Sequence, residues 1–375
     1  MTDAPPLGVY VHWPYCVRIC PYCDFNVVRD RGRTEEQAAL ARTIVEDLRR
    51  WREETGQRRL TSVFFGGGTP SLMDPAHVAA ILDTAAELWS PQPDLEVSLE
   101  ANPTDAETAR FAGFAAAGVD RLSLGLQSLD DEALTFLGRN HDAASARRAA
   151  ERAAALFPRL SVDLIYARPG QTPDAWAAEL TEAVNLGAEH ISPYQLTIEQ
   201  GTAFDRAVGR GAFTPPDADL AADLFDTTQA VLEAAGFDAY EVSNHATGEA
   251  ARSRHNLIYW RGHDYVGAGP GGHGRLTIGG SRVASTAPRK IADYIAGEGF
   301  ERETLTDREA AEERLLLGLR IDDGVSFHEV AALGLTPGSV RHLIDAGLLA
   351  DDPLRLRATR QGRLVLDRLT AELAR

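Results

Sequence analysis

Cys16-Val-Arg-Ile-Cys20-Pro-Tyr-Cys23 holds all three cysteines of this 375-residue chain. A disulfide framework needs an even number of cysteines. A structural zinc site usually takes two separated pairs of ligands, and here only His12 stands close upstream of the triplet. A cubane iron-sulfur cluster takes four ligands, so three thiolates leave one iron open to another ligand. The triplet therefore favours a 4Fe-4S cluster with one open coordination position.

The overall composition is that of a globular protein, because 44% of the residues are hydrophobic. A formal net charge of −17 argues against sequence-independent binding to nucleic acid, which needs basic patches. The first residues, Met1-Thr-Asp-Ala-Pro-Pro6, have no basic and apolar export signal, and no apolar run has the length of a membrane span. We expect a cytoplasmic chain that is not an integral membrane protein, which also suits reduced thiols.

Short apolar runs alternate with longer helical patterns over the first 200 residues, which is typical of a parallel sheet wrapped by helices. Six strands are expected at 8–12, 62–65, 95–99, 121–125, 161–165 and 190–195, with helices at about 34–55, 75–89, 105–117, 130–156 and 173–187. In parallel β/α barrels, functional groups gather at the carboxyl ends of the strands. The cysteine loop, Gly66-Gly67-Gly68-Thr69-Pro70, Glu100, Gln127 and Asp163 all fall at or near such ends. We expect them to meet at one mouth.

The remaining chain predicts two further parts. Residues 201–300, with a helix at 217–235 and a strand at 238–243, are expected to form a separate layer beside the 1–200 barrel. Residues 301–375 have the order of short helices, a small β-wing and a final helix, which resembles a winged helix. Gly267-Ala-Gly-Pro-Gly-Gly272 fits the dinucleotide pattern G-x-G-x-x-G, but Pro270 interrupts it, and a tight loop is the better interpretation.

Several further segments carry a resemblance to a known family over nearly the whole chain. They are the stretch from Gly8 to Phe25, Phe64-Phe-Gly-Gly-Gly-Thr-Pro-Ser-Leu72, Glu100-Ala-Asn-Pro103, Arg121-Leu-Ser-Leu-Gly-Leu-Gln-Ser128, Leu137-Gly-Arg139, Asp163-Leu-Ile-Tyr166, Ser192-Pro-Tyr-Gln-Leu-Thr-Ile198 and Arg254-His-Asn-Leu-Ile-Tyr-Trp260. Together they resemble the radical SAM superfamily, and within it the group that holds oxygen-independent coproporphyrinogen III oxidase and the HemW haem chaperone.

The resemblance implies a partial parallel (β/α)6 barrel in which S-adenosylmethionine (SAM) binds the open iron of the cluster on Cys16, Cys20 and Cys23. It implies that the following residues bind SAM: Tyr10, Tyr22, Gly67, Gly68, Thr69, Glu100, Gln127, Arg139 and Asp163. For Glu100 a strand-end cap, and for Asp163 a partner of a helix dipole, are the structural alternatives. Arg168 departs from the relatives and either pairs with a carboxylate of a bound ligand or faces solvent.

Phe25 discriminates between the two relatives. The oxidase pattern continues C-x3-C-x2-C-x-C, and this chain has Phe25 at the position of the extra cysteine. The oxidase also has a longer segment before its cluster. Both departures favour the chaperone.

The segment His255-Asn-Leu-Ile-Tyr259-Trp260 resembles the H-N-x-x-Y-W haem motif of the chaperone group. The resemblance implies that His255 is a ligand of the haem iron and that Tyr259 and Trp260 cover the macrocycle. The alternative is a core histidine packed against Tyr259. Weaker candidates for a second iron ligand are His245, His263 and His273.

We therefore expect a chaperone that carries a 4Fe-4S cluster, SAM and haem and delivers the haem to a recipient haemoprotein, with a low-potential electron donor as a further partner. No catalytic residue is assigned. A tetrapyrrole-modifying enzyme related to the oxidase is the alternative, and a cluster-containing scaffold that no longer cleaves SAM is a third possibility.

Overall fold

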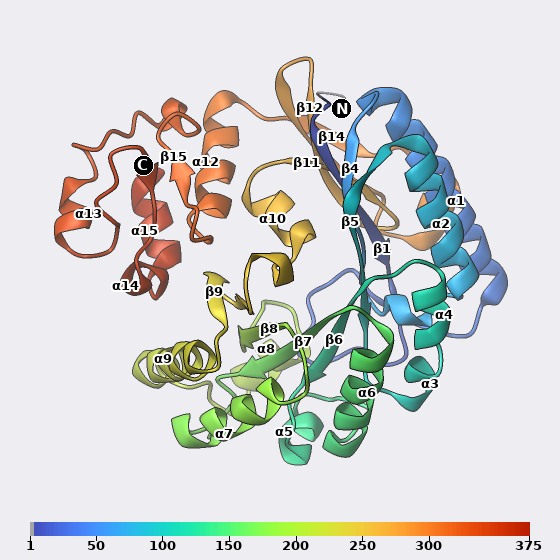
Figure 1. Cartoon of the computed structure of the whole chain (residues 1–375), viewed down its shortest axis with the longest axis horizontal. Helices are drawn as coiled ribbons and strands as arrows, with labels where there is room; N and C mark the ends of the chain where they lie inside the picture. The colour runs from blue at the N-terminus through green and yellow to red at the C-terminus, as the bar shows by residue number, and fades with distance from the viewer. Residues whose placement is uncertain (1–3) are drawn as a thin grey trace.

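The computed structural model describes residues 4–375 (Figure 1). Residues 1–3, which belong to the stretch that the export-signal prediction concerns, lie outside the described part. Within residues 4–375 no helix has the length and apolar character needed to cross a membrane.

A twelve-stranded sheet in the order β14-β13-β12-β11-β1-β4-β5-β6-β7-β8-β10-β9 organises the fold. All six predicted strands are confirmed at its centre: β1 (Pro6–Trp13), β4 (Arg59–Gly67), β5 (Ser90–Ala101), β6 (Arg121–Gln127), β7 (Arg159–Tyr166) and β8 (His190–Gln195). Each pairs in parallel with the next. The predicted α/β class with a partial (β/α)6 barrel is therefore correct, and the carboxyl ends of the six strands share one edge.

Helices α1 (Thr34–Thr55), α2 (Pro75–Leu88), α6 (Ala143–Leu156) and α7 (Pro173–Val184) lie along the outer side of the curved sheet (Figure 1). Their buried stripes include Ile44, Ile81 and Trp176, which join the main core. Asp74 and Thr172 cap α2 and α7 by accepting hydrogen bonds from backbone amides of the first turn. Helix α9 (Ala218–Ala234) follows the expected 217–235 segment.

Two predicted helices are interrupted. The 130–156 helix divides into α5 (Asp131–Phe136) and α6, because Gly138 adopts a left-handed φ of 68° and Asp142 starts a new helix by capping Ser145. A Cβ atom on residue 138 would lie 2.6 Å from the Pro21 ring, so only glycine fits there. The break leaves Arg139 in a turn. The 105–117 helix likewise divides, into α3 (Asp105–Thr108) and α4 (Phe111–Ala116).

Residues 201–300 extend the sheet at both edges and do not form the expected separate layer. β10 (Asn244–Ala246) pairs with β8, and β11 (Asp264–Ala268) pairs in parallel with β1. Unpaired backbone groups on the edge strands β8 and β1 are satisfied in this way. The other elements of this region are α8 (Ala203–Gly209), β9 (Asp238–Glu241), η2 (Glu249–Ala251), α10 (Arg254–Trp260), β12 (His273–Ile278), β13 (Ser281–Thr286) and α11 (Ile291–Ile295), followed by β14 (Glu301–Thr304). Strand β12 follows the glycine-rich 267–272 segment directly, so the interpretation as a tight loop is confirmed.

The C-terminal part has a hydrophobic core of its own, built on Leu315, Val325 and Leu356. Its elements are α12 (Asp307–Gly318), β15 (Val325–Ser326), η3 (Ala331–Leu333), α13 (Arg341–Asp345), β16 (Arg355–Leu356), α14 (Arg360–Arg363) and α15 (Leu366–Leu373). The winged-helix character is not confirmed. The expected wing at 347–363 contains one two-residue strand, which pairs with β15, and a short helix.

Candidate functional site

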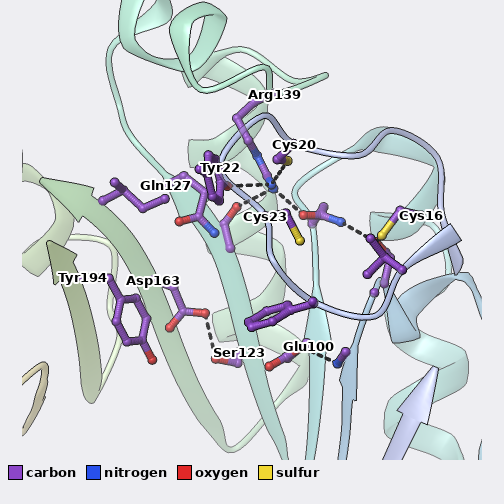
Figure 2. A pocket seen from close by; sticks show the side chains of 18 of the residues that line it. Cys16, Cys20, Tyr22, Cys23, Glu100, Ser123, Gln127, Arg139, Asp163 and Tyr194 are labelled. Atoms are coloured by element: carbon purple, nitrogen blue, oxygen red, sulfur yellow. Dashed lines mark hydrogen bonds between the residues drawn. The ribbon is translucent and has the colours of Figure 1, made fainter. Parts of the chain in front are cut away.

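A cavity of about 410 Å³ opens at the carboxyl ends of the central strands. Side chains of the cysteine loop line one side of it, and side chains of β5 to β8 line the other (Figure 2). Eleven sequence-predicted residues line this pocket: Cys16, Cys20, Cys23, Tyr22, Gly67, Gly68, Thr69, Glu100, Gln127, Arg139 and Asp163. The expectation of one common mouth is therefore correct for these residues, whereas their roles toward a cofactor remain predictions.

Backbone and side-chain hydrogen bonds hold the cysteine loop in place. Strand β2 (Tyr15–Cys16) pairs with β3 (Val28–Arg29), which closes the loop at its two ends. The Asn26 side chain donates to the backbone carbonyls of Pro270 and Arg289, both at 2.9 Å. The loop is thus anchored to a segment that lies more than 240 residues away in the sequence.

Arg139 connects the cysteine loop to the strand ends. Its Nη1 atom donates to the Cys20 sulfur at 3.2 Å, and its Nη2 atom donates to the side chain of Asn102 and to the Gly125 carbonyl. Asn102 in turn donates to Thr69 at 3.2 Å. The Thr69 hydroxyl lies 3.5 Å from the Cys16 sulfur and donates to it. One polar chain therefore runs between two of the three thiols.

The chemistry of the donors fits an iron-sulfur cluster. Burial raises the pKa of the Cys16 thiol to about 11, against the opposing effect of the Thr69 hydrogen bond. Burial likewise raises the pKa of Cys23. Binding of iron to these thiols would displace their protons, and the Arg139 guanidinium would then face an anionic sulfur. No three His, Cys, Asp or Glu side chains in residues 4–375 have the spacing of a site for a single metal ion.

Gly67, at the end of β4, packs against the His12 side chain of β1. Its φ of 107° lies in the left-handed region, and a Cβ atom there would lie 2.5 Å from the His12 ring. His12 is held between the Tyr10 hydroxyl, 3.0 Å from Nδ1, and the Asn26 carbonyl, 2.8 Å from Nε2. Both nitrogens of His12 are thus occupied, so this histidine does not join the cysteines as a ligand in this arrangement.

Two carboxyl groups, Glu100 on β5 and Asp163 on β7, project into the pocket from either side of β6 (Figure 2). Burial, together with the nearby charge of Asp163, raises the pKa of Glu100 to about 8. Glu100 accepts a hydrogen bond from the Gly67 amide at 3.1 Å. Burial also raises the pKa of Asp163, which accepts from Ser123 at 3.0 Å. The Glu100 carboxyl therefore favours the neutral form near neutral pH, and burial shifts Asp163 in the same direction.

Tyr10 and the three predicted haem-binding residues do not line the pocket. The His255 ring is 1% exposed and stacks on Phe64 with 4.9 Å between the ring centroids. Its Nδ1 atom lies 2.7 Å from the Ser62 hydroxyl, and its Nε2 atom lies 2.5 Å from the Tyr259 hydroxyl. Burial lowers the pKa of His255 to about 3. The arrangement matches the core-histidine alternative: neither ring nitrogen is free for iron here.

The weaker iron-ligand candidates are dispersed. His245 is buried in β10 beside Gln229, His263 is exposed after α10, and His273 is exposed at the start of β12. None of the three lines the pocket.

Both expectations for Arg168 are wrong. Its guanidinium is buried and pairs with Glu179 and Ser128 within the protein. The cation thus balances a buried carboxylate of α7 and faces neither a ligand nor solvent.

Comparisons with known proteins agree with this geometry. Residues 10–182 match the Radical SAM superfamily, and residues 305–365 match the HemN C-terminal domain. The chain is 37% identical to "Heme chaperone HemW" of Mycobacterium tuberculosis, over 98% of this chain and 95% of that protein. It is 34% identical to "Heme chaperone HemW" of Bacillus subtilis, over 96% of each. The chain belongs to the HemW family of radical SAM proteins.

Other relatives extend this family. "Radical S-adenosyl methionine domain-containing protein 1, mitochondrial" of Bos taurus is 42% identical to this chain, over 98% of the chain and 87% of that protein. The structure of coproporphyrinogen III oxidase from Escherichia coli matches 99% of this HemW-family chain, and the match covers 90% of the oxidase chain with a TM-score of 0.80. At 20% identity, that match shows a common fold.

Several polar residues of the pocket have no role predicted from the sequence, among them Asn102, Arg121, Ser192 and Asn256. Asn102 and Arg121 stand within the motifs given above, and Asn256 follows His255 directly. The period-2 alternation of β6 was a usable signal for Arg121, because Ser123, Gly125 and Gln127 line the same face. No comparable signal existed for Asn256, whose direction depends on how α10 enters the barrel.

Proposed function

We propose that this chain binds a 4Fe-4S cluster through Cys16, Cys20 and Cys23 and binds SAM on the open iron. The convergence of the three thiols, Arg139 and Thr69 on one cavity supports this proposal. When bound, the cluster supplies an electron and a Lewis-acidic iron to the sulfonium cofactor. Arg139 and Thr69 would stabilise the thiolates through hydrogen bonds, and the Gly67–Gly68 backbone would leave room for the amino-acid end of SAM.

We further propose that the chain is a haem chaperone, which binds haem and transfers it to a recipient haemoprotein. The single observation that carries this proposal is the 34–37% identity to proteins named Heme chaperone HemW over 96–98% of the chain. Apolar side chains at the pocket rim, including Val17, Ile19 and the 62% exposed Phe25, offer a surface that suits an apolar macrocycle.

His255 as the haem ligand now requires a specific rearrangement. Because its two ring nitrogens contact Ser62 and Tyr259, coordination of iron would break at least one of these contacts and move α10. If His255 binds the haem iron in this way, both Ser62→Ala and His255→Ala should change the absorption spectrum of bound haem.

The test is a haem titration beside an assay for coproporphyrinogen oxidation, both on anaerobically reconstituted protein. A haem chaperone shows a saturable Soret shift, transfers haem to an apo-haemoprotein and gives no protoporphyrinogen. Formation of protoporphyrinogen with consumption of SAM would overturn the chaperone assignment in favour of an oxidase-type enzyme. Absence of a saturable Soret shift would overturn it as well.

A further inference from the structure

Arg121 is a buried cation at the bottom of the pocket, and its guanidinium has no direct partner. It is 2% exposed and lines the cavity from the first position of β6. Within residues 4–375 no ion pair or side-chain hydrogen bond involves its guanidinium, and its Nε atom is buried without a partner. A guanidinium carries five N–H donors, and burying it without hydrogen bonds is costly. A bound ligand that supplies the hydrogen-bond acceptor would offset this cost.

The position of Arg121 separates it from the cluster site. β6 runs from Arg121 to Gln127 at the mouth, which at about 3.3 Å per residue is a distance of roughly 20 Å along the strand. Arg121 pairs in register with Ser98 on β5, whose hydroxyl is also buried without a partner. Two side chains that each have a buried polar atom without a partner therefore lie next to each other in register, at the end of β6 opposite the mouth.

The Glu96 carboxylate, which interacts with the charge of Arg121, already has other hydrogen-bond donors. Glu96 accepts hydrogen bonds from Arg159 at 2.7 Å and from the backbone amides of Arg254 and His255. Burial opposes its ionisation, but Arg121 and Arg159 together lower the pKa of Glu96 overall. It interacts with Arg121 through space, without a direct contact.

The other carboxyl groups of the pocket make no ion pair with Arg121 either. Burial raises the pKa of Glu100 to about 8 and also raises the pKa of Asp163, which disfavours the charged form of both groups. Asn256 and Ser192 also line the pocket and add neutral polar groups. The floor of the pocket thus holds a guanidinium that has no direct ionic partner and lies among polar side chains, which is an environment that can receive an anion.

We propose that Arg121, with Asn256 and Ser192, binds a carboxylate of the ligand that fills this pocket. Guanidinium and carboxylate match in a planar, bidentate geometry, which gives this pairing its specificity. Under the proposed function, on which this inference rests, the carboxylate is a haem propionate. The carboxylate of SAM is the other source, and the experiment distinguishes the two.

The experiment uses full-length, cluster-reconstituted wild type, Arg121→Gln, Arg121→Lys and Arg159→Gln. Arg159 is the matched control, because it pairs in register with Arg121 on the next strand but holds Glu96 and Glu189 instead of lining the pocket. Dissociation constants are measured for haem, for haem with both propionates esterified, and for SAM. Thermal unfolding of the ligand-free protein and cluster absorbance report on folding.

The expected result is that esterification weakens binding to wild type by roughly 10- to 100-fold, the worth of a hydrogen-bonded charge pair. Arg121→Gln weakens binding of free haem by a similar factor and leaves ester binding unchanged. Arg121→Lys restores part of the preference for the free acid. Arg159→Gln lowers the unfolding temperature but keeps that preference. If Arg121→Gln loses affinity for SAM but not for haem, the carboxylate that Arg121 binds is that of SAM, and the proposed carboxylate site stands.

Two results would overturn the inference. One is unchanged affinity for both haem and SAM in a folded Arg121→Gln. The other is equal loss of haem and of its ester, because that pattern indicates a general distortion. If Arg121→Gln does not fold, the affinities of Arg121→Lys for haem, for its ester and for SAM test the inference instead. Failure of wild type to bind haem would refute the chaperone function, and the SAM arm would still test Arg121.

Discussion

Arg139 donates a hydrogen bond to the sulfur of Cys20 at 3.2 Å, although 119 positions separate the two residues. The guanidinium reaches the thiol because Gly138 ends α5 one residue earlier and turns the chain toward Pro21. The break between α5 and α6 is therefore part of the cysteine site.

Arg139→Gln is expected to destabilise the bound cluster. Removal of a charged donor from an anionic sulfur costs about 1.5–3 kcal/mol, so cluster loss to an iron chelator should be at least about tenfold faster. The measurement is the decay of cluster absorbance under anaerobic conditions. Arg148→Gln, an exposed arginine on α6, is the control. Equal decay rates in the two variants would contradict a role for the Arg139 contact.

Gly67→Ala is expected to distort the contact between β4 and His12. The substitution adds a clash at 2.5 Å to a φ of 107°, so the free energy of unfolding should fall by more than about 1–3 kcal/mol. Chemical denaturation measures this loss. Gly170→Ala is the control, because Gly170 has a φ of 74° with open space around it. A loss no greater than that of the control would show that the steric contact is unimportant.

Glu100→Gln is expected to remove part of the pH dependence of stability in cluster-free protein. The carboxyl loses its proton near pH 4.5 in the unfolded chain and near pH 8 in the folded chain. Between these values the folded state holds more protons, so stability decreases as pH rises, by up to about 1.4 kcal/mol per unit. Unfolding curves at pH 5.5, 6.5 and 7.5 measure the slope. Glu53→Gln, on the exposed face of α1, should leave it unchanged. An identical slope in Glu100→Gln would refute the shifted pKa.

Arg168→Met is expected to destabilise the fold by about 3–5 kcal/mol, because Glu179 would be left as an uncompensated buried charge. The double variant Arg168→Met, Glu179→Leu should recover most of this loss. Chemical denaturation of the wild type, the two single variants and the double variant measures the coupling free energy between the two side chains. The exposed pair Arg341 and Asp345 serves as the comparison and should show a coupling of about 0–1 kcal/mol. Additive losses in the buried pair would show that the two charges do not interact.

The central strands could be predicted because their signal is local. Runs such as Ser62-Val-Phe-Phe65 and Arg121-Leu-Ser-Leu-Gly125 are short, apolar and bounded by glycine or helical patterns, and the structure confirms each of them. The convergence of the cysteines with Thr69, Glu100 and Asp163 followed from one rule, that parallel strands end at a common edge.

The features that could not be predicted from the sequence depend on contacts between distant parts of the chain. Gly138 lies within an otherwise helical pattern, and only the Pro21 ring that packs against it explains the interruption. The pairing of β11 with β1 could not be inferred, since either edge of the sheet could accept the strand. His255 stands in a motif that suggested a ligand, but its surroundings, Ser62, Phe64 and Tyr259, come from two separate elements.

The anchoring of the cysteine loop also sets an order of events during biosynthesis. The three thiols emerge from the ribosome early, but Asn26 finds its acceptors only after Pro270 and Arg289 have been synthesised and β11 has docked on β1. Until about three quarters of the chain exists, the loop lacks this long-range restraint. Stable assembly of a metal centre is therefore expected only after residue 289 has been synthesised, and a nascent chain that stalls before this point would expose free thiols beside an unpaired sheet edge.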